Sequence, residues 1–322
     1  MADIRVEKAD LSEYSKFLSE NPPGNPYSLP PLLEAYSRAF SRDFQCIHIV
    51  KNDTTIASCA LFTASRLGQK TVKLMPLRAY DGVHFRSLGD SKAQKQEYDR
   101  LMSLQALEEF LRREYGFYQM VFQPGFMDVR AFQWAGAGVM PQFTYVVDLQ
   151  TFSEENYTKS LREVLRSAER AGLTTGKCAA DELVSLNVLS YERHGRRPPV
   201  PMDLLTHLLA SVEKTGMLDV TCVRNRDGVI IAGMASLKTP RGLFFYLSGT
   251  DARAEKGASH LLYHELLSSG RVNGLSFVDF VGANTPTINL FKSSFGPRLE
   301  TNFRVWRANS LVTRLASLVK KI

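Results

Sequence analysis

The chain has 322 residues, 44% of them hydrophobic, and its 40 Lys and Arg outnumber its 33 Asp and Glu to give a net charge of +7. This length fits two compact domains, each able to bury its own core. No apolar run approaches the length of a transmembrane helix, which excludes an integral helical membrane protein. The positive charge favours phosphate-bearing partners such as tRNA, a nucleotide or coenzyme A.

The cysteines and the first residues of the chain bear on its compartment. The cysteines form no C-x-x-C pair and have no histidine at zinc-site spacing, so they are predicted to be buried thiols in a reducing compartment. They are Cys46, Cys59, Cys178 and Cys222. The charged stretch 1–8 offers no apolar segment for a signal peptide. We therefore expect a cytoplasmic protein without a metal site.

The first half of the chain predicts a mixture of helices and strands. Asn and Asp in the stretch 51–54 mark a hairpin turn between two alternating segments. Helical and alternating periods predict the remaining elements. In chain order, the elements are a strand at 4–6, a helix ending near Ser19, a helix at 29–40, strands at 44–50, 55–64 and 71–75, a helix at 101–115, a strand at 118–122, a short helix at 129–134 and a strand at 143–149.

The second half of the chain predicts similar elements in the same order. They are a helix at 202–214, strands at 218–223, 229–238 and 243–248, a helix at 258–269, a strand at 276–281, a short helix at 288–294 and a strand at 303–307. Phe132-Gln133 stands in the first copy where Phe291-Lys292 stands in the second. We infer two copies of one α/β unit; the alternative is two generic α/β domains that share this order by chance.

The most informative stretch is a strand, a loop and a short helix at 277–296. The segment 277–281 is apolar except for Asp279, and 282–286 has the composition of a turn, which ends the strand. A proline at the first helical turn and a glycine past the helix end mark the limits of the helix. Asp279 is therefore predicted to be an acid in a buried strand, and Lys292 is predicted to project from the helix towards the strand end.

This stretch resembles the Fem peptidyltransferases, a branch of the GNAT acyltransferase superfamily, in which a strand reading D-F-x-G precedes F-K-x-x-F-G. The matching residues are 279–282 and 291–296. The resemblance implies that Lys292 takes part in acyl transfer, whereas a solvated lysine on a surface helix is the alternative. By the same resemblance, the loop residue Asn284 and the motif residue Phe291 are candidate substrate-binding residues.

The resemblance also implies the fold class, which is α/β with two tandem GNAT-like domains, each a mixed β-sheet flanked by helices. The expected domains are residues 1–150 and 181–309, joined by a linking helix with an arginine stripe at 151–180. A basic amphipathic helix is expected at 310–322. It would either touch a membrane or pack on the body of the protein.

A GNAT domain that uses coenzyme A holds the pyrophosphate on backbone amides at the start of its long helix, in a sequence like R/Q-x-x-G-x-G/A. The corresponding stretch here is 254–259, so Lys256, Gly257 and Ser259 are the candidate cofactor-binding residues. Ala254 departs from the pattern, which has a polar residue at that position. Simple capping of the helix by Ser259 is the alternative.

An arginine stripe lies on the predicted helix at 157–171. Arg162 and Arg166 are four residues apart, in a stretch that looks like the R-x-x-x-R-x-A-x-x-x-G sequence of Fem-like proteins. Guanidinium groups can each bind a phosphate through two hydrogen bonds, which suits a tRNA backbone or a nucleotide-linked substrate. A solvated helix face is the alternative.

The stretch 191–199 is the densest cationic part of the chain, and its prolines restrict the loop. Substrate loops of Fem-like proteins fall here, so Arg193, Arg196 and Arg197 are the candidates for holding an anionic acceptor. His194 is either a base or a bystander in this loop.

The sequence contains no motif for a protein nucleophile, because G-x-S-x-G, H-E-x-x-H and a Walker loop are all absent. This absence favours direct aminolysis, in which an amine attacks an ester or thioester that its carrier has activated. Tyr246, on the strand that flanks the acyl group in GNAT domains, either protonates a leaving oxygen or is a core residue. The candidate catalytic residues are therefore Lys292, Tyr246 and Asp279.

Three functions are compatible with these features. The first is a Fem-like N-acyltransferase that takes an aminoacyl group from aminoacyl-tRNA and forms an amide on a cell-wall precursor or a related anionic small molecule. The second takes its acyl group from acyl-coenzyme A or an acyl carrier protein and modifies a polysaccharide or lipid. The third is a catalytically silent GNAT-fold binding protein. We expect no permanently bound cofactor in any of them.

Overall fold

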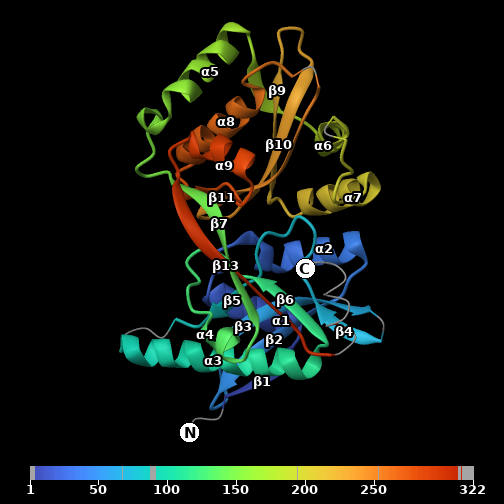
Figure 1. The fold of residues 1–322 in the computed structure, drawn as a ribbon, viewed down its shortest axis with the longest axis vertical. Helices are drawn as coiled ribbons and strands as arrows, with labels where there is room; N and C mark the ends of the chain where they lie inside the picture. Colours follow the sequence, from blue (N-terminus) through green and yellow to red (C-terminus); the bar gives the residue numbers. More distant parts are fainter. Residues whose placement is uncertain are drawn as a thin grey trace. The chain divides into compact units, whose positions relative to one another are not determined.

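The computed structural model of the chain (Figure 1) describes residues 4–310 apart from 67, 88–91, 194 and 253, together with residue 313. The chain divides into two units. The first unit comprises Met1–Gln142 with Thr301–Ile322, and the second unit comprises Phe143–Glu300. Each unit is described below by itself.

The first unit is built on a mixed sheet. Its elements are β1 (Ile4–Ala9), α1 (Leu11–Glu20), a 3-10 turn (Pro26–Ser28), α2 (Pro30–Phe40), β2 (Phe44–Lys51), β3 (Thr54–Arg66), β4 (Gln69–Val72), β5 (Val83–Phe85), α3 (Ala93–Glu114), β6 (Phe117–Val121), α4 (Arg130–Trp134) and most of β13 (Arg298–Ala308). The strand order is β1-β2-β3-β4-β6-β13, and β5 pairs with β3. Strands β4 and β6 are parallel, and the other neighbouring strands are antiparallel.

The second unit has the same architecture. Its elements are most of β7 (Gly138–Asp148), a 3-10 turn (Glu154–Asn156), α5 (Lys159–Arg170), β8 (Thr174–Lys177), α6 (Ala180–Glu192), α7 (Met202–Glu213), β9 (Leu218–Arg224), β10 (Ile230–Lys238), β11 (Gly242–Thr250), α8 (Ala258–Val272), β12 (Phe277–Asp279) and α9 (Pro286–Ser293). The strand order is β8-β9-β10-β11-β12-β7. Strands β11 and β12 are parallel, and the other neighbours are antiparallel.

The two units therefore share one strand order and one pattern of strand directions, as expected for a duplicated α/β unit. From α3 onwards the copies align at a constant offset of 159 residues, which pairs Leu104 with Tyr263, Val121 with Phe280 and Gln133 with Lys292. At the same offset, β6 coincides with β12 and α4 with α9. This numbering makes the two copies comparable residue by residue.

The closing strands are exchanged between the copies, which corrects the predicted boundaries at 1–150 and 181–309. Strand β7 ends the first copy in sequence but pairs with β12 of the second unit, and β13 ends the second copy but pairs with β6 of the first unit. The alternating pattern of a closing strand shows that it is a strand and does not show which sheet it joins. The predicted linker 151–180 is likewise part of the second unit.

Two elements of the second unit were not predicted, and one prediction cannot be compared. Strand β8 contains glycine and lysine, and α6 has no strong apolar stripe, so neither has a clear period. The helix predicted at 310–322 lies outside the described residues except at 310 and 313. Among the described residues, no helix is long and apolar enough to cross a membrane.

The predicted hairpin shows why local sequence determines some of these elements. Its two turn residues, Asn52 and Asp53, have φ angles of 45° and 62°, a left-handed conformation that Asn and Asp adopt more readily than most residues. The strands they join alternate, so that Ile47, Ile49 and Ala57 are buried in the core of the first unit. Turn and alternation together set the register of β2 against β3.

Candidate active site

Strands β11 and β12 part in the middle of the second unit. They pair only over Gly242–Phe244 and Phe277–Asp279. Beyond this point β11 follows β10, and the register between them shifts because Ala235 pairs with Leu247 while Ser236 pairs with Phe245. Such a β-bulge bends the strand that carries it. The segment after β12 therefore continues without β11 beside it.

A cavity of about 610 Å³ lies where the strands part. Its walls come from β11, α8, the loop after β12, and α9. The lining residues are Phe245, Ser248, Ser259, Tyr263, Val281, Gly282, Asn284, Thr285, Thr287, Ile288, Phe291 and Lys292. All of them belong to the second unit. The volume falls in the usual range for sites that bind small molecules.

Lys292 lies at the base of this pocket with 4% of its surface exposed. Its Nζ donates hydrogen bonds to the carbonyl oxygens of Phe280, Val281 and Gly282 at 2.7, 2.8 and 2.8 Å. These carbonyls follow β12 at the point where β11 has departed. The ammonium group thus satisfies three acceptors at the open edge of the strand, and its three N–H donors are all used.

Burial shapes the electrostatics of Lys292. Removal from water lowers the pKa of the Lys292 ammonium to about 8, and the nearby Asp279 carboxylate opposes this shift. The Nζ atom also lies 5.1 Å from the centre of the Phe245 ring, within the range of a cation–π contact. The pocket therefore holds a cation at neutral pH that loses its proton under mildly basic conditions.

Asp279 holds the backbone that Lys292 contacts. Its Oδ1 accepts hydrogen bonds from Thr144 Oγ1 at 2.6 Å and from Val281 N at 2.8 Å. Thr144 Oγ1 accepts one from Gly282 N at 3.0 Å. Asp279 is buried and faces this turn, so its contacts are those of a residue that fixes the turn.

The turn itself is strained at Val281. This β-branched residue has a φ of 50°, a region that branched side chains rarely occupy. The Val281 carbonyl accepts a hydrogen bond from Lys292 Nζ, and the Val281 N–H donates one to Asp279 Oδ1. These two hydrogen bonds hold Val281 in this conformation. Backbone strain that the surrounding structure maintains in this way is concentrated at functional sites.

An aromatic wall closes the other side of the pocket, and sequence reasoning missed most of it. The Tyr263 ring lies 5.6 Å from Phe245, 5.0 Å from Phe280 and 5.0 Å from Phe291 between ring centres. Of these, only Phe291 was a predicted site residue. In the sequence, Tyr263 and Phe245 have the spacing of ordinary core positions, which gives no sign that they line a cavity.

The other predicted residues of this region differ in their placement. Ser259, Asn284 and Phe291 line the pocket together with Lys292. The Asn284 side chain exchanges hydrogen bonds with the backbone N–H and carbonyl of Phe143, which holds the loop to β7. Tyr246 is buried on β11 and is not one of the residues that line the pocket.

The arginines predicted to bind substrate lie outside the pocket. Arg193, just after α6, donates from its guanidinium to Thr250 Oγ1 at 3.2 Å and to the Asp251 carbonyl at 3.4 Å, at the end of β11. Arg196 and Arg197 are exposed, and His194 lies outside the described residues. On α5, the guanidinium of Arg162 donates to the Glu155 carbonyl at 3.1 Å, and Arg166 is exposed.

The predicted phosphate loop has a different explanation for its glycine. Gly257 has a φ of 105°, and a Cβ at this position would lie 3.0 Å from Ala168 Cβ and 3.2 Å from the Val164 carbonyl. The close packing of α5 against the start of α8 therefore requires glycine there. Lys256 is exposed beside it. In the described part of the chain, no group of three or more His, Cys, Asp or Glu could hold a metal ion.

In the first unit, the chain itself fills the gap that is open in the second. After β4 the chain loops away and returns, so that Asp81 forms an isolated parallel β-bridge with Phe122. Asp81 N donates to the Val121 carbonyl at 2.6 Å, and Asp81 Oδ2 accepts from Val121 N at 3.0 Å. Val121 is the counterpart of Phe280, whose carbonyl accepts from Lys292. Gln133, the counterpart of Lys292, is exposed.

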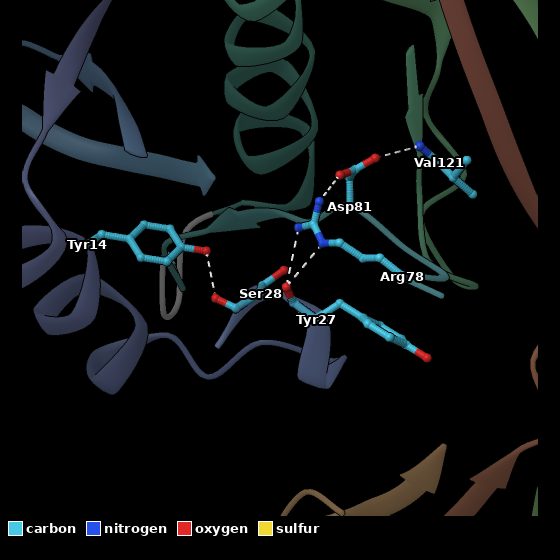
Figure 2. A network of polar contacts seen from close by, with 6 residues as sticks. All are labelled: Tyr14, Tyr27, Ser28, Arg78, Asp81 and Val121. Carbon is cyan, nitrogen blue, oxygen red and sulfur yellow. Dashed lines mark hydrogen bonds and ion pairs between the residues drawn. The ribbon is translucent and has the colours of Figure 1, made fainter. Parts of the chain in front are cut away.

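A buried arginine supports this filling segment. Figure 2 shows Arg78 between Asp81 and Tyr27: its guanidinium forms an ion pair with Asp81 and donates twice to the Tyr27 carbonyl, at 3.3 Å each. Burial raises the pKa of Asp81 and Arg78 opposes this shift. Because the filling segment satisfies the strand edge, the first unit has no need of a lysine at position 133.

Comparison with known proteins relates these features to families. Residues 155–292 match the family described as "Acetyltransferase (GNAT) domain". FemX is 12% identical in sequence at a TM-score of 0.65, over 97% of this chain and 99% of FemX. L-PGS from Bacillus licheniformis is 17% identical in sequence at a TM-score of 0.60, over 98% of this chain and 97% of L-PGS. A tandem GNAT protein from the clavulanic acid biosynthesis pathway is 11% identical in sequence at a TM-score of 0.54, over 96% of this chain and 99% of that protein. No curated protein matches the sequence.

Proposed function

We propose that the pocket of the second unit transfers an acyl group from an activated carrier to an amine, because residues 155–292 match an acetyltransferase (GNAT) domain family and the chain has a fold similar to that of a tandem GNAT protein. The observation that carries this proposal is the parting of β11 and β12. It opens a cavity of about 610 Å³ lined by Lys292, whereas in the first unit Asp81 occupies the edge of β6 at this point and the corresponding cavity is smaller, about 280 Å³.

The reaction needs no nucleophile from the protein. The amine nitrogen attacks the carbonyl carbon of an ester or thioester, a C–N bond forms, and the C–O or C–S bond to the carrier breaks. The proton lost by the amine balances the one taken up by the leaving alcohol or thiol, through water. Among the described lining residues there is no carboxylate or imidazole, so the contribution of the protein is alignment and electrostatic stabilisation.

Lys292 supplies the electrostatic part in this proposal. Its three N–H groups are used by backbone carbonyls, so it acts on the reacting carbonyl through its charge and through the turn that it holds. Negative charge develops on the carbonyl oxygen as the amine adds, and a cation fixed in the lining of the pocket stabilises that state more than the ground state. Asp279 positions the same turn.

Aminoacyl-tRNA is the first candidate donor. The F-K-x-x-F-G resemblance to Fem peptidyltransferases and the fold shared with FemX support it. Arg193 contacts the end of β11, and Arg196 and Arg197 follow it exposed to solvent. These cations suit the phosphates of a tRNA acceptor end. The acceptor in this version is the amine of a cell-wall precursor or a related anionic molecule.

Acyl-coenzyme A is the second candidate donor, and one observation favours it. The described lining of the pocket contains the Lys292 cation, a wall of aromatic rings and no acid. An uncharged acyl group fits this lining, whereas an aminoacyl group would bring its own ammonium into it. The match to an acetyltransferase domain family agrees with this alternative.

A donor assay tests the proposal and separates its two versions. The full-length protein is incubated with a charged tRNA pool or with short and aromatic acyl-coenzyme A thioesters, each with a mixture of amines, and new amides are detected by mass spectrometry. We expect amide formation with one class of donor. Turnover with charged tRNA alone supports the first donor, and turnover with thioesters alone supports the second. Absence of any amide with both classes would refute an acyltransferase at this pocket and favour a binding protein.

Charge reversal at the exposed arginines is expected to weaken donor or acceptor binding. In the double variant Arg196→Glu/Arg197→Glu, the Kd for the donor or acceptor should rise at least tenfold at low salt. The dependence of log Kd on the logarithm of the salt concentration should flatten as phosphate contacts are lost. Both side chains are exposed, so folding should be unaffected. Arg241→Glu, an exposed arginine in the β10–β11 turn, is the matched control. Equal binding by the double variant and the control at every salt concentration would assign both arginines to the solvated surface.

A further inference from the structure

The first unit contains a cavity at the position that corresponds to the pocket of the second unit. It has a volume of about 280 Å³ and is lined by Asn21, Pro22, Gly24, Val83, His84, Phe85, Arg100, Leu104, Gln123, Gly125, Phe126, Met127 and Asp128. The offset of 159 residues pairs Arg100 with Ser259 and Gln123 with Gly282, which line the pocket of the second unit. The duplication has therefore kept a pocket in both copies.

This cavity continues into a second one of about 300 Å³, which shares Asn21, Pro22, Phe85 and Arg100 with it. We call the two together the first-unit groove. Strand β5 forms part of its wall, whereas β11 does so in the second unit. The groove thus lies beside the strand edge that Asp81 occupies, at the position in the first unit that corresponds to the proposed acyl pocket, and its lining differs from that of the pocket.

The charges in the first-unit groove are paired except at one residue. Asp128 accepts from the Arg130 guanidinium at 2.9 Å, Asp99 forms an ion pair with Lys51, and Glu20 lies 3.8 Å from Arg86. In the remaining case, the guanidinium of Arg100 lies 5.6 Å from the centre of the Phe85 ring.

Among the residues that the structure describes, Arg100 has no acid as a partner. It is exposed and borders both cavities. Within the described residues, the groove therefore carries one positive charge without an acidic partner, on a guanidinium that lies against the Phe85 ring. A ligand with one negative charge would complete this arrangement.

Buried polar atoms next to the groove lack partners as well. His84 is 6% exposed and lines the cavity, and its Nε2 has no hydrogen-bond partner within the described residues. Ser28 Oγ also has no hydrogen-bond partner within the described residues. A Cβ on Gly82 would overlap both His84 Nε2 and Ser28 Oγ. Burial and the Arg78 charge lower the pKa of His84 to about 4, so the ring is neutral at pH 7. Buried polar groups nearly always have a hydrogen-bond partner in the protein or in ordered water, so these two atoms are available to a ligand or to water.

We propose that the first-unit groove binds a small monocarboxylate, with the carboxylate on Arg100 and the polar body of the molecule hydrogen-bonded by His84 Nε2 and the amide nitrogen of Gln123. Gln123 Oε1 already accepts from Asn25, so the amide nitrogen of Gln123 and the neutral imidazole are the groups that recognise hydroxyl or amide groups. One arginine balances a carboxylate, whereas a phosphate dianion requires at least one further cation. The ligand site is separate from the proposed acyl pocket and does not depend on the reaction there.

Titration calorimetry on the full-length protein tests this inference. The probes are gluconate and N-acetylglycine, which are monocarboxylates with hydroxyl or amide groups, and glycerol 3-phosphate as the competing anion. We expect at least one carboxylate to bind with one-to-one stoichiometry. Arg100→Gln should weaken that binding at least tenfold, because it removes a charge-assisted hydrogen-bond pair. Arg38→Gln, an exposed arginine on α2 outside the groove, should leave it unchanged.

Two further measurements make the outcome decisive. When the carboxylate binds, the imidazole nitrogen signals of His84 should shift in the NMR spectrum of labelled protein. Lys292→Met should still bind the carboxylate. The test of this site is therefore independent of whether the proposed acyl transfer occurs. Three results would overturn the inference: no carboxylate binds below about 10 mM, glycerol 3-phosphate binds more tightly than either carboxylate, or Arg100→Gln binds as the wild type does. In the first case the first-unit groove would hold only water.

Discussion

Replacing Lys292 by Met is expected to lower turnover by roughly a hundredfold or more, the usual effect of removing one electrostatic group from a transition state. Methionine keeps the aliphatic length and removes the only cation in the described lining of the second-unit pocket. The measurement is steady-state turnover with whichever donor the assay identifies. Gln133→Met is the matched control, because position 133 is the counterpart of 292 in the first unit and is exposed. It should leave turnover unchanged.

The same substitution also affects stability, and the two effects have to be separated. Lys292→Met leaves the carbonyls of Phe280, Val281 and Gly282 without their donor. The free energy of unfolding should fall by about 1–3 kcal/mol for each carbonyl that water cannot reach. Thermal unfolding measures this loss, and turnover is compared at a temperature where the variant is fully folded. Wild-type turnover by the folded variant would show that Lys292 only satisfies the strand edge.

The pH dependence distinguishes charge from shape at this residue. Since burial lowers the pKa of Lys292 to about 8, the cation is present below pH 8 and is lost as the pH rises above it. Wild-type turnover should therefore fall on the basic side of pH 8, and Lys292→Met should show no such fall. A residue that acted only by filling space would produce the same pH profile in both proteins.

Ending the chain at Glu300 is expected to prevent the first unit from folding stably. This truncation removes the pairing of Arg304–Ala308 with Phe117–Val121 and the fully buried Val305. It also removes the Asn302 side chain that donates to the Phe122 carbonyl, and Arg307, which lies 3.6 Å from the buried Glu108 carboxylate. The loss should be comparable to the whole stability of a domain, about 5–15 kcal/mol.

Limited proteolysis and circular dichroism measure the effect of this truncation. The matched control is a chain that ends at Ser310, which keeps β13 and should behave as the full-length protein does. In the shorter chain, the second unit should resist proteolysis while the first unit is digested. Equal resistance of the first unit in both chains would contradict the pairing of β13 with β6.

The sequence predicted those parts of the fold that local chemistry determines. The Asn52-Asp53 turn, the order of elements in both halves and the acid within the strand at Asp279 all follow from period and turn composition. The exchange of β7 and β13 does not follow from them, because a strand has the same period whichever sheet it joins. The order of elements therefore identified the duplicated unit but placed its boundaries incorrectly.

The candidate site was predictable as a motif and unpredictable as a geometry. The F-K-x-x-F-G resemblance pointed to Lys292, and the structure shows its Nζ against three carbonyls, which no residue pattern indicates. The segment around Asp81 that fills the gap in the first unit was likewise missed, because the sequence 73–92 has no strong period. Such contacts depend on where distant backbone segments meet.

The exchanged closing strands also reverse the order in which the parts of the chain can finish folding. The second unit is continuous, from Phe143 to Glu300, and includes its own closing strand at the start. The first unit is synthesised earlier but waits for β13, which leaves the ribosome after the whole second unit, roughly 10–30 s later at about 5–20 residues per second. During that interval the edge of β6 is exposed and open to pairing with another nascent chain. The earlier half of the protein is therefore the one that stays incomplete for longest during translation.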